Sequence, residues 1–129
     1  NELIPYIQKK FNPNIIETLD RLSELVLDEE DYMQNVTEEA FTEILIEQEN
    51  KKIVLNLKKF NQQEHVIKTR IIMQITKILY GTSNGIEKKH VEDIIKLCGN
   101  NIGNKFLMPN KYYKISVKGG KVSFEKLSH

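Results

Sequence analysis

The strongest constraint on this chain is a long run of helix-forming sequence with one apolar face. Its apolar residues recur in steps of three and four, at Ile15, Leu19, Leu22, Val26, Met33, Val36, Ala40 and Ile44. This spacing predicts a helix from Pro13 to about Glu47, although the apolar pattern is interrupted near Glu29 and Glu30. Such a helix would be roughly 50 Å long, because each residue adds about 1.5 Å. A small domain is narrower than that, so part of the apolar face must pack on something else.

The residues ahead of this helix predict a shorter one. Apolar side chains between Leu3 and Phe11 have helical spacing. Asn12 can then cap the long helix, and Pro13 can occupy its first turn. The chain starts with Asn1 instead of methionine, so we expect it to be an excerpt from a longer protein.

A change in composition near Asn50 marks an expected domain boundary. Residues 53–57 follow a charged segment and are rich in strand-forming side chains. Helical spacing then resumes and ends at Gly81, which can adopt the left-handed conformation that terminates a helix. The inward side chains of this helix are expected to be Ile67, Ile71, Ile75, Ile78 and Leu79.

One more helix and three strands are expected in the last third of the sequence. The helix runs from about Glu87 to Cys98, with Gly99 at its end. Gly119 and Gly120 suit a two-residue hairpin turn, because such turns require positive φ. The strands are expected at residues 105–108, 112–117 and 121–127.

Together these elements predict an α+β fold made of two parts. Residues 1–50 are expected to form a helical arm or connector, and residues 51–129 a small α+β domain. In this domain two helices pack on a short, largely antiparallel sheet. A chain of 129 residues is long enough for such a domain with a modest core.

Charge is distributed unevenly along the chain, although the formal net charge is only +1. Acidic residues crowd the first half, including the run from Asp28 to Asp31, and lysines dominate after residue 50. Consecutive helical residues point about 100° apart, so the acidic run is expected to be a solvated surface and not a cation site. It would also repel phosphates, so any nucleic acid is expected to contact the second half.

The sequence carries no motif of an autonomous enzyme. It lacks a glycine-rich phosphate loop and the GxSxG, CxxC and HExxH patterns, so we expect no catalytic residue and no metal site. His65, His90 and His129 have no metal-ligand spacing and are expected to be structural or solvated.

The lone cysteine bears on the cellular compartment. Cys98 excludes an intramolecular disulfide, and its place in an apolar helical pattern predicts a small buried side chain. Such a thiol suits a reducing compartment, and we expect a cytoplasmic protein. No apolar run approaches the roughly 20 residues that cross a bilayer, so no membrane partner is expected.

Basic residues in the second half are the main functional signal. Lysines neutralise phosphates, and an exposed Tyr112 or Tyr113 could stack on an unpaired base. Lysine-rich hairpins also serve only solubility and edge protection, and Arg70 could pair with an acid of the long helix instead of a phosphate. Both interpretations stay open. The candidate RNA-binding residues are Lys68, Arg70, Lys105, Lys111, Lys114, Lys118 and Lys121.

Several short strings, in order along nearly the whole chain, resemble the middle of tRNA(Ile)-lysidine synthases, formerly called MesJ-type cell-cycle proteins. They are Leu3-Ile4-Pro5, Asn12-Pro13-Asn14-Ile15, Asp31-Tyr32, Arg70-Ile71-Ile72, His90-Val91 and Lys105-Phe106-Leu107-Met108-Pro109. Arg70 matches a position that is commonly basic in the family. His90 matches a helix-opening position, where capping or packing competes with substrate contact. The hairpin departs from the family pattern, which has arginines and a tyrosine before the turn.

The resemblance implies a bacterial ATP-dependent ligase, which joins lysine to the wobble cytidine of the AUA-reading isoleucine tRNA. In that family, ATP and Mg²⁺ are used by an N-terminal pyrophosphatase-loop domain with an SGGxDS signature, which does not occur here. The present chain would be the connecting helix and the small substrate-binding domain, which help to position tRNA(Ile) for the catalytic domain of the same protein. No cofactor is expected in this part, and by itself it is expected to be inactive.

An alternative interpretation involves no RNA. The long amphipathic helix could pair with a partner helix or with its own copy, which would make the chain a protein-interaction module or a homodimer through the helical arm. The interruption at Glu29 and Glu30 weakens the pattern of a continuous coiled coil.

Overall fold

The computed structural model describes residues 14–82, 86–99 and 104–127, with side chains from residue 25 onward. The short helix expected over residues 3–11, and the cap expected at Asn12 and Pro13, lie outside the described residues. The chain divides into two compact units, residues 1–35 and 36–129. The boundary expected near residue 50, as the start of an independent domain, stays a prediction.

The long helix is present as α2, which spans Asn14–Ile44. It continues through Glu29 and Glu30, where the apolar pattern is interrupted. It also ends earlier than Glu47, because the chain turns directly into a strand at Leu45. The helical pattern could not reveal this end, since the strand is stabilised by pairing with a later segment. In the second unit, the last turns of α2 bury a face made of Thr37, Ala40, Phe41 and Ile44.

The second unit is built on a five-stranded sheet in the order β1-β2-β5-β4-β3. Every neighbouring pair of strands is antiparallel, which confirms the α+β fold. The first strand was not expected from the sequence. The strands are β1 (Leu45–Gln48), β2 (Lys52–Asn56), β3 (Lys105–Asn110), β4 (Tyr113–Lys118) and β5 (Lys121–Lys126).

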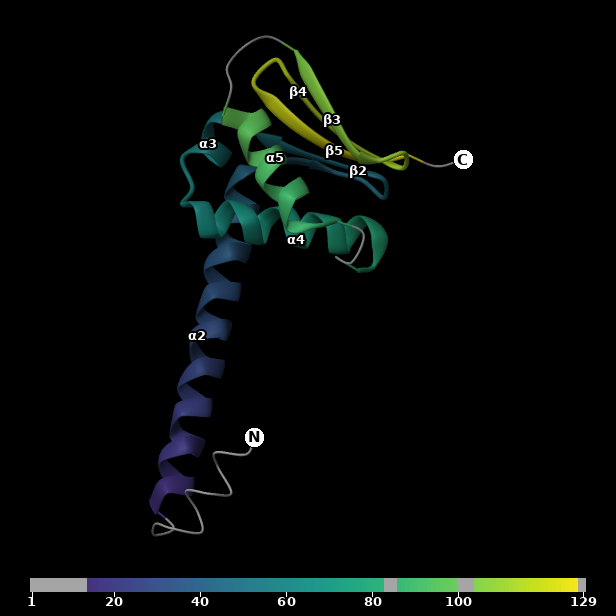
Figure 1. The fold of residues 1–129 in the computed structure, drawn as a ribbon. Coiled ribbons are helices and arrows are strands. Elements are labelled where there is room, and N and C mark those ends of the chain that lie inside the picture. The colour runs from purple at the N-terminus through teal and green to yellow at the C-terminus, as the bar shows by residue number, and fades with distance from the viewer. Residues whose placement is uncertain (1–13, 83–85, 100–103, 128–129) are drawn as a thin grey trace. The chain divides into compact units, whose positions relative to one another are not determined.

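Three helices pack on one face of this sheet, as Figure 1 shows for α4 and α5. They are α3 (Leu57–Asn61), α4 (His65–Tyr80) and α5 (Lys88–Gly99). The short α3 was not expected. Asn56 caps it, because its side-chain oxygen accepts a hydrogen bond from the Lys59 amide at 2.9 Å. Helix α4 ends as predicted at Gly81, whose φ is 79°. Ile78, expected to point inward, is 42% exposed, and Ile72 is buried instead.

The core lies between the sheet and the helices. The central strands contribute fully buried residues in register, because Phe124 of β5 pairs with Ile53 of β2 on one side and Ile115 of β4 on the other. The β4–β5 hairpin closes through Gly119 and Gly120, whose φ values of 59° and 78° confirm the predicted turn. No helix within the described residues is long and apolar enough to span a membrane.

Candidate nucleic-acid interface

Strict alternation along β4 separates its apolar side chains from its lysines. Tyr113, Ile115 and Val117 are buried against the helices, so Lys114 and Lys118 point to the opposite side of the sheet. The register then places Lys121 beside Lys118, Ser123 beside Ser116, and Phe106 beside Ser116. We call this surface the outer face. It consists of Phe106, Lys114, Ser116, Lys118, Lys121, Ser123 and Glu125.

An exposed aromatic ring stands among these lysines. Phe106 lies on the edge strand β3 and is 63% exposed. The Lys114 ammonium lies 5.0 Å from the centre of its ring, within the range of a cation–π interaction. A ring that is exposed and flanked by positive charge can stack on an unpaired base while the lysines contact phosphates. Phe106 was not predicted from the sequence, in which the two tyrosines were the expected stacking residues.

The expectation that Tyr113 offers an exposed stacking surface is wrong. Its side chain is 1% exposed and packs edge-on against Tyr80, with ring centres 5.1 Å apart. Its hydroxyl lies 3.0 Å from the Thr76 hydroxyl, and burial raises the pKa of Tyr113. Tyr112 is half-buried in the β3–β4 turn, where the Lys111 ammonium lies 5.2 Å from its ring. The strand register, which pairs Tyr113 with the inner side of β5, accounts for its burial.

The other candidate residues do not join the outer face. Lys105 pairs with the buried Val117, so it shares the inner side of the sheet and is half-buried. Lys111 is exposed in the β3–β4 turn, at one end of the sheet. Lys68 and Arg70 are half-buried on α4, in the helical layer, and Arg70 already interacts with another group of the protein. The structure therefore brings together Lys114, Lys118 and Lys121 and separates the remaining four candidates from them.

The charge of the outer face over β3, β4 and β5 is positive. Glu125 stands beside Lys114 in the register and offsets part of its charge, but Lys118 and Lys121 at the hairpin end have no acid beside them on these strands. Both of these lysines are exposed, so they can meet phosphates without losing contacts inside the domain.

The cysteine and one of the histidines have structural roles. Cys98 is fully buried, which confirms that prediction, and burial raises the pKa of its thiol to about 12. His90 caps α5, because its Nδ1 accepts a hydrogen bond from the Glu87 amide at 3.2 Å. Among the described residues, no three His, Cys, Asp or Glu side chains gather in a group that could hold a metal ion.

Comparison with known proteins identifies the family. No protein-family model matches the chain. The tRNA(Ile)-lysidine synthase of Clostridioides difficile is 32% identical over 106 residues, which cover 82% of this chain and 23% of that protein.

Two further relatives carry the same name. The tRNA(Ile)-lysidine synthase of Clostridium perfringens is 33% identical over 121 residues, or 89% of this chain and 25% of the relative. That of Clostridium tetani is 30% identical over 129 residues, or 98% of this chain and 27% of the relative. The chain spans about a quarter of the length of these relatives. These matches confirm the resemblance seen in the short sequence strings, and the chain belongs to the tRNA(Ile)-lysidine synthase family.

Proposed function

We propose that this chain is the tRNA-positioning part of an ATP-dependent tRNA(Ile)-lysidine synthase, and that its outer face contacts the tRNA. The relatives are named tRNA(Ile)-lysidine synthases. By the family resemblance, the full protein would join lysine to the wobble cytidine of AUA-decoding tRNA(Ile). ATP and Mg²⁺ would be bound by a catalytic domain elsewhere in the longer protein. The chain alone would neither hydrolyse ATP nor form lysidine, and either activity in a pure preparation would contradict this assignment.

The observation that carries the proposal is the gathering of Lys114, Lys118 and Lys121 on one side of a hairpin, next to an exposed Phe106. Lys118 and Lys121 pair across strands about 4.8 Å apart, and Lys114 lies four residues and so about 13 Å from Lys118 along β4. The flexible lysine side chains can therefore contact several phosphates along one nucleic-acid backbone. Lysines placed only for solubility do not require a neighbouring exposed ring.

The test is a salt series of tRNA binding. Unmodified isoleucine tRNA with a CAU anticodon is titrated with the chain, and methionine tRNA, which also carries CAU, serves as competitor. Each phosphate neutralised by a lysine contributes roughly 0.9 to the slope of log K against log salt on duplex RNA or DNA. Replacing Lys114, Lys118 and Lys121 together by glutamine should therefore reduce the magnitude of that slope by roughly two to three.

The control variant removes the same charge elsewhere in the domain. Lys58 and Lys59 on α3 and Lys96 on α5 are exposed lysines of the helical layer. Replacing these three by glutamine changes the net charge equally but should leave the salt slope nearly unchanged. Equal losses in the two triple variants would mean that tRNA responds only to net charge. The outer face would then not be the binding surface.

A second candidate function rests on α2. In the first unit this helix exposes four large apolar side chains, and such a surface is typical of a contact with another protein segment. They are Leu25, Val26, Leu27 and Tyr32. Homodimerisation through the arm would appear in sedimentation as a concentration-dependent mass. Replacing Leu25 and Val26 by serine should abolish it if the helix is the interface. A monomer at all concentrations would reject the dimer.

A further inference from the structure

A groove separates α4 from α5 on the helical side of the second unit. It has a volume of about 290 Å³ and is lined by His65, Thr69 and Met73 from α4 and by Lys88, Val91 and Glu92 from α5. The α4 residues are four apart and so lie along one face of that helix. Most of the lining is apolar, and Val91 forms a buried wall. This volume is at the lower end of ligand pockets, which suits a single small ring system.

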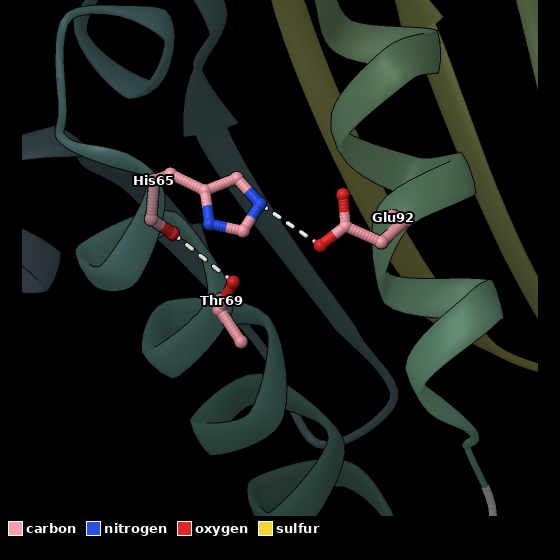
Figure 2. Close-up of polar contacts among 3 residues, drawn as sticks. All are labelled: His65, Thr69 and Glu92. Atoms are coloured by element: carbon pink, nitrogen blue, oxygen red, sulfur yellow. Dashed lines mark hydrogen bonds and ion pairs between the residues drawn. The ribbon is translucent and has the colours of Figure 1, made fainter.

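One end of the groove carries a defined set of hydrogen-bonding atoms. His65 Nε2 lies 2.8 Å from Glu92 Oε1 and links the two helices, as Figure 2 shows. The second carboxylate oxygen, Oε2, has no hydrogen-bond partner among the described residues. The Thr69 hydroxyl donates to the His65 carbonyl at 3.0 Å, so its proton is already used. The one N–H of a neutral His65 imidazole is donated to Glu92, so the rim presents the carboxylate oxygens of Glu92 as its acceptors.

Guanine has complementary groups along its pairing edge. Its 2-amino group and N1–H are adjacent donors that a carboxylate can accept together. Adenine, cytosine and uracil each lack two adjacent donors on this edge. Met73 and Val91 can contact the flat face of the ring, since both line the apolar part of the groove.

A cation also lines this groove. Lys88 lines the groove one helical turn before Glu92, which is about 6 Å along the helix axis. Lys88 has no ion pair with the described residues, whereas the neighbouring Lys89 lies outside the groove and 3.8 Å from the Glu87 carboxylate. The long side chain of Lys88 can reach the phosphate of a nucleotide whose base lies at Glu92.

We propose that this groove binds one unpaired guanine nucleotide, with the base edge on Glu92 and the phosphate on Lys88. The inference deepens the proposed function, because it rests on the premise that this domain meets RNA. A free guanine nucleotide would present the same chemistry as an unpaired guanosine in RNA. In RNA the chain continues beyond the phosphate, whereas the free nucleotide ends there.

The test is an NMR titration of the full 129-residue chain with GMP, IMP and guanosine. GMP should shift the amide signals of Thr69, Met73 and Val91. IMP lacks the 2-amino group and should bind roughly tenfold more weakly, because it loses one hydrogen bond to a charged acceptor. Glu92→Gln should weaken GMP to the level of IMP. Lys88→Gln should weaken GMP to the level of guanosine, and the matched Lys89→Gln should leave GMP binding unchanged.

Three results would overturn the proposal: shifts that avoid the groove, equal binding of GMP and IMP, or equal effects of Lys88→Gln and Lys89→Gln. A short oligoribonucleotide with one unpaired guanosine separates the two sources, because it should bind more tightly than GMP if RNA is the ligand. The outer-face lysines are intact in every groove variant. Loss of GMP binding with unchanged tRNA salt slopes would therefore reject the groove alone and leave the proposed function standing.

Discussion

Raising the pH from about 8 to about 10.5 is expected to destabilise the folded chain through the ionisation of Cys98 in the unfolded state. The thiol is fully buried, and its pKa is raised from the ordinary value of 9.0 to about 12, mainly by burial and against a smaller lowering by the charge of Lys68. Folding therefore favours the protonated thiol. The stability it contributes is complete below pH 9 and is lost as the pH rises towards 12.

The magnitude follows from the two pKa values. At about pH 10.5 the unfolded thiol is ionised and the folded thiol is not, and the solution lies about 1.5 pH units above the unfolded pKa. Each unit is equivalent to about 1.4 kcal/mol, so the free energy of unfolding should fall by about 2 kcal/mol through this one group. That is a large part of the stability of a small domain.

Urea unfolding followed by circular dichroism, under reducing conditions at both pH values, measures this loss. The comparison that isolates the thiol is with Cys98→Ala. This variant should be less stable at pH 8, because it leaves a small cavity. Its further loss between the two pH values should nevertheless be smaller than that of the wild type by about 2 kcal/mol. Tyr113, whose pKa is also raised by burial, contributes alike in both proteins and cancels.

An identical pH-dependent loss in wild type and Cys98→Ala would refute the reasoning. It would mean that the folded thiol ionises as readily as the unfolded one and is therefore not buried in the core. A hydrogen bond fixes the backbone at this residue, because Asn61 Nδ2 donates to the Cys98 carbonyl at 2.9 Å. A buried thiol in this position should also react slowly with a thiol reagent at pH 8.

Two further predictions concern the hairpin and the buried hydroxyl pair. Gly120→Ala should lower the free energy of unfolding, measured by urea unfolding, by about 1 kcal/mol. The cost comes from the backbone, because φ is 78° and an added Cβ would meet no neighbour within 4 Å. Gly119→Asn should cost less, because asparagine suits this turn. Thr76 donates to the Ile72 carbonyl at 2.9 Å, so Tyr113 donates to Thr76. Thr76→Val should therefore be more destabilising than Tyr113→Phe in the same assay, because it leaves a buried donor unpaired.

The elements that the sequence predicts well are those with local signals. Helix α4 ends at a glycine that takes positive φ, and the β4–β5 turn uses two such glycines. The elements that it missed depend on partners distant in the chain. Strand β1 continues the apolar pattern of α2, and only its pairing with β2 makes it extended. Helix α3 has five residues, too few for a helical period to show, and Asn56 is its main local signal.

The candidate site was predictable in part. The alternation Tyr113-Lys114-Ile115-Ser116-Val117-Lys118 already separates lysines from apolar residues, so the common side of Lys114 and Lys118 and the burial of Tyr113 follow from strand geometry. The edge strand β3 gives no such signal, because the consecutive residues Phe106, Leu107 and Met108 place apolar side chains on both sides of the strand. Only the pairing of Phe106 with Ser116 decides that the ring faces outward.

The chemistry of the outer face limits what it can recognise. Its cations are lysines, which contact phosphates as point charges and lack the forked geometry with which arginine reads a base edge or grips a phosphate through two bonds. Phosphate contacts fix position and carry no sequence information, and stacking on Phe106 accepts any base. The outer face should therefore bind the isoleucine and methionine tRNAs with similar strength. Any preference of this chain between them would have to arise from a surface that reads base edges, and the groove beside Glu92 has a carboxylate that can accept hydrogen bonds from such an edge.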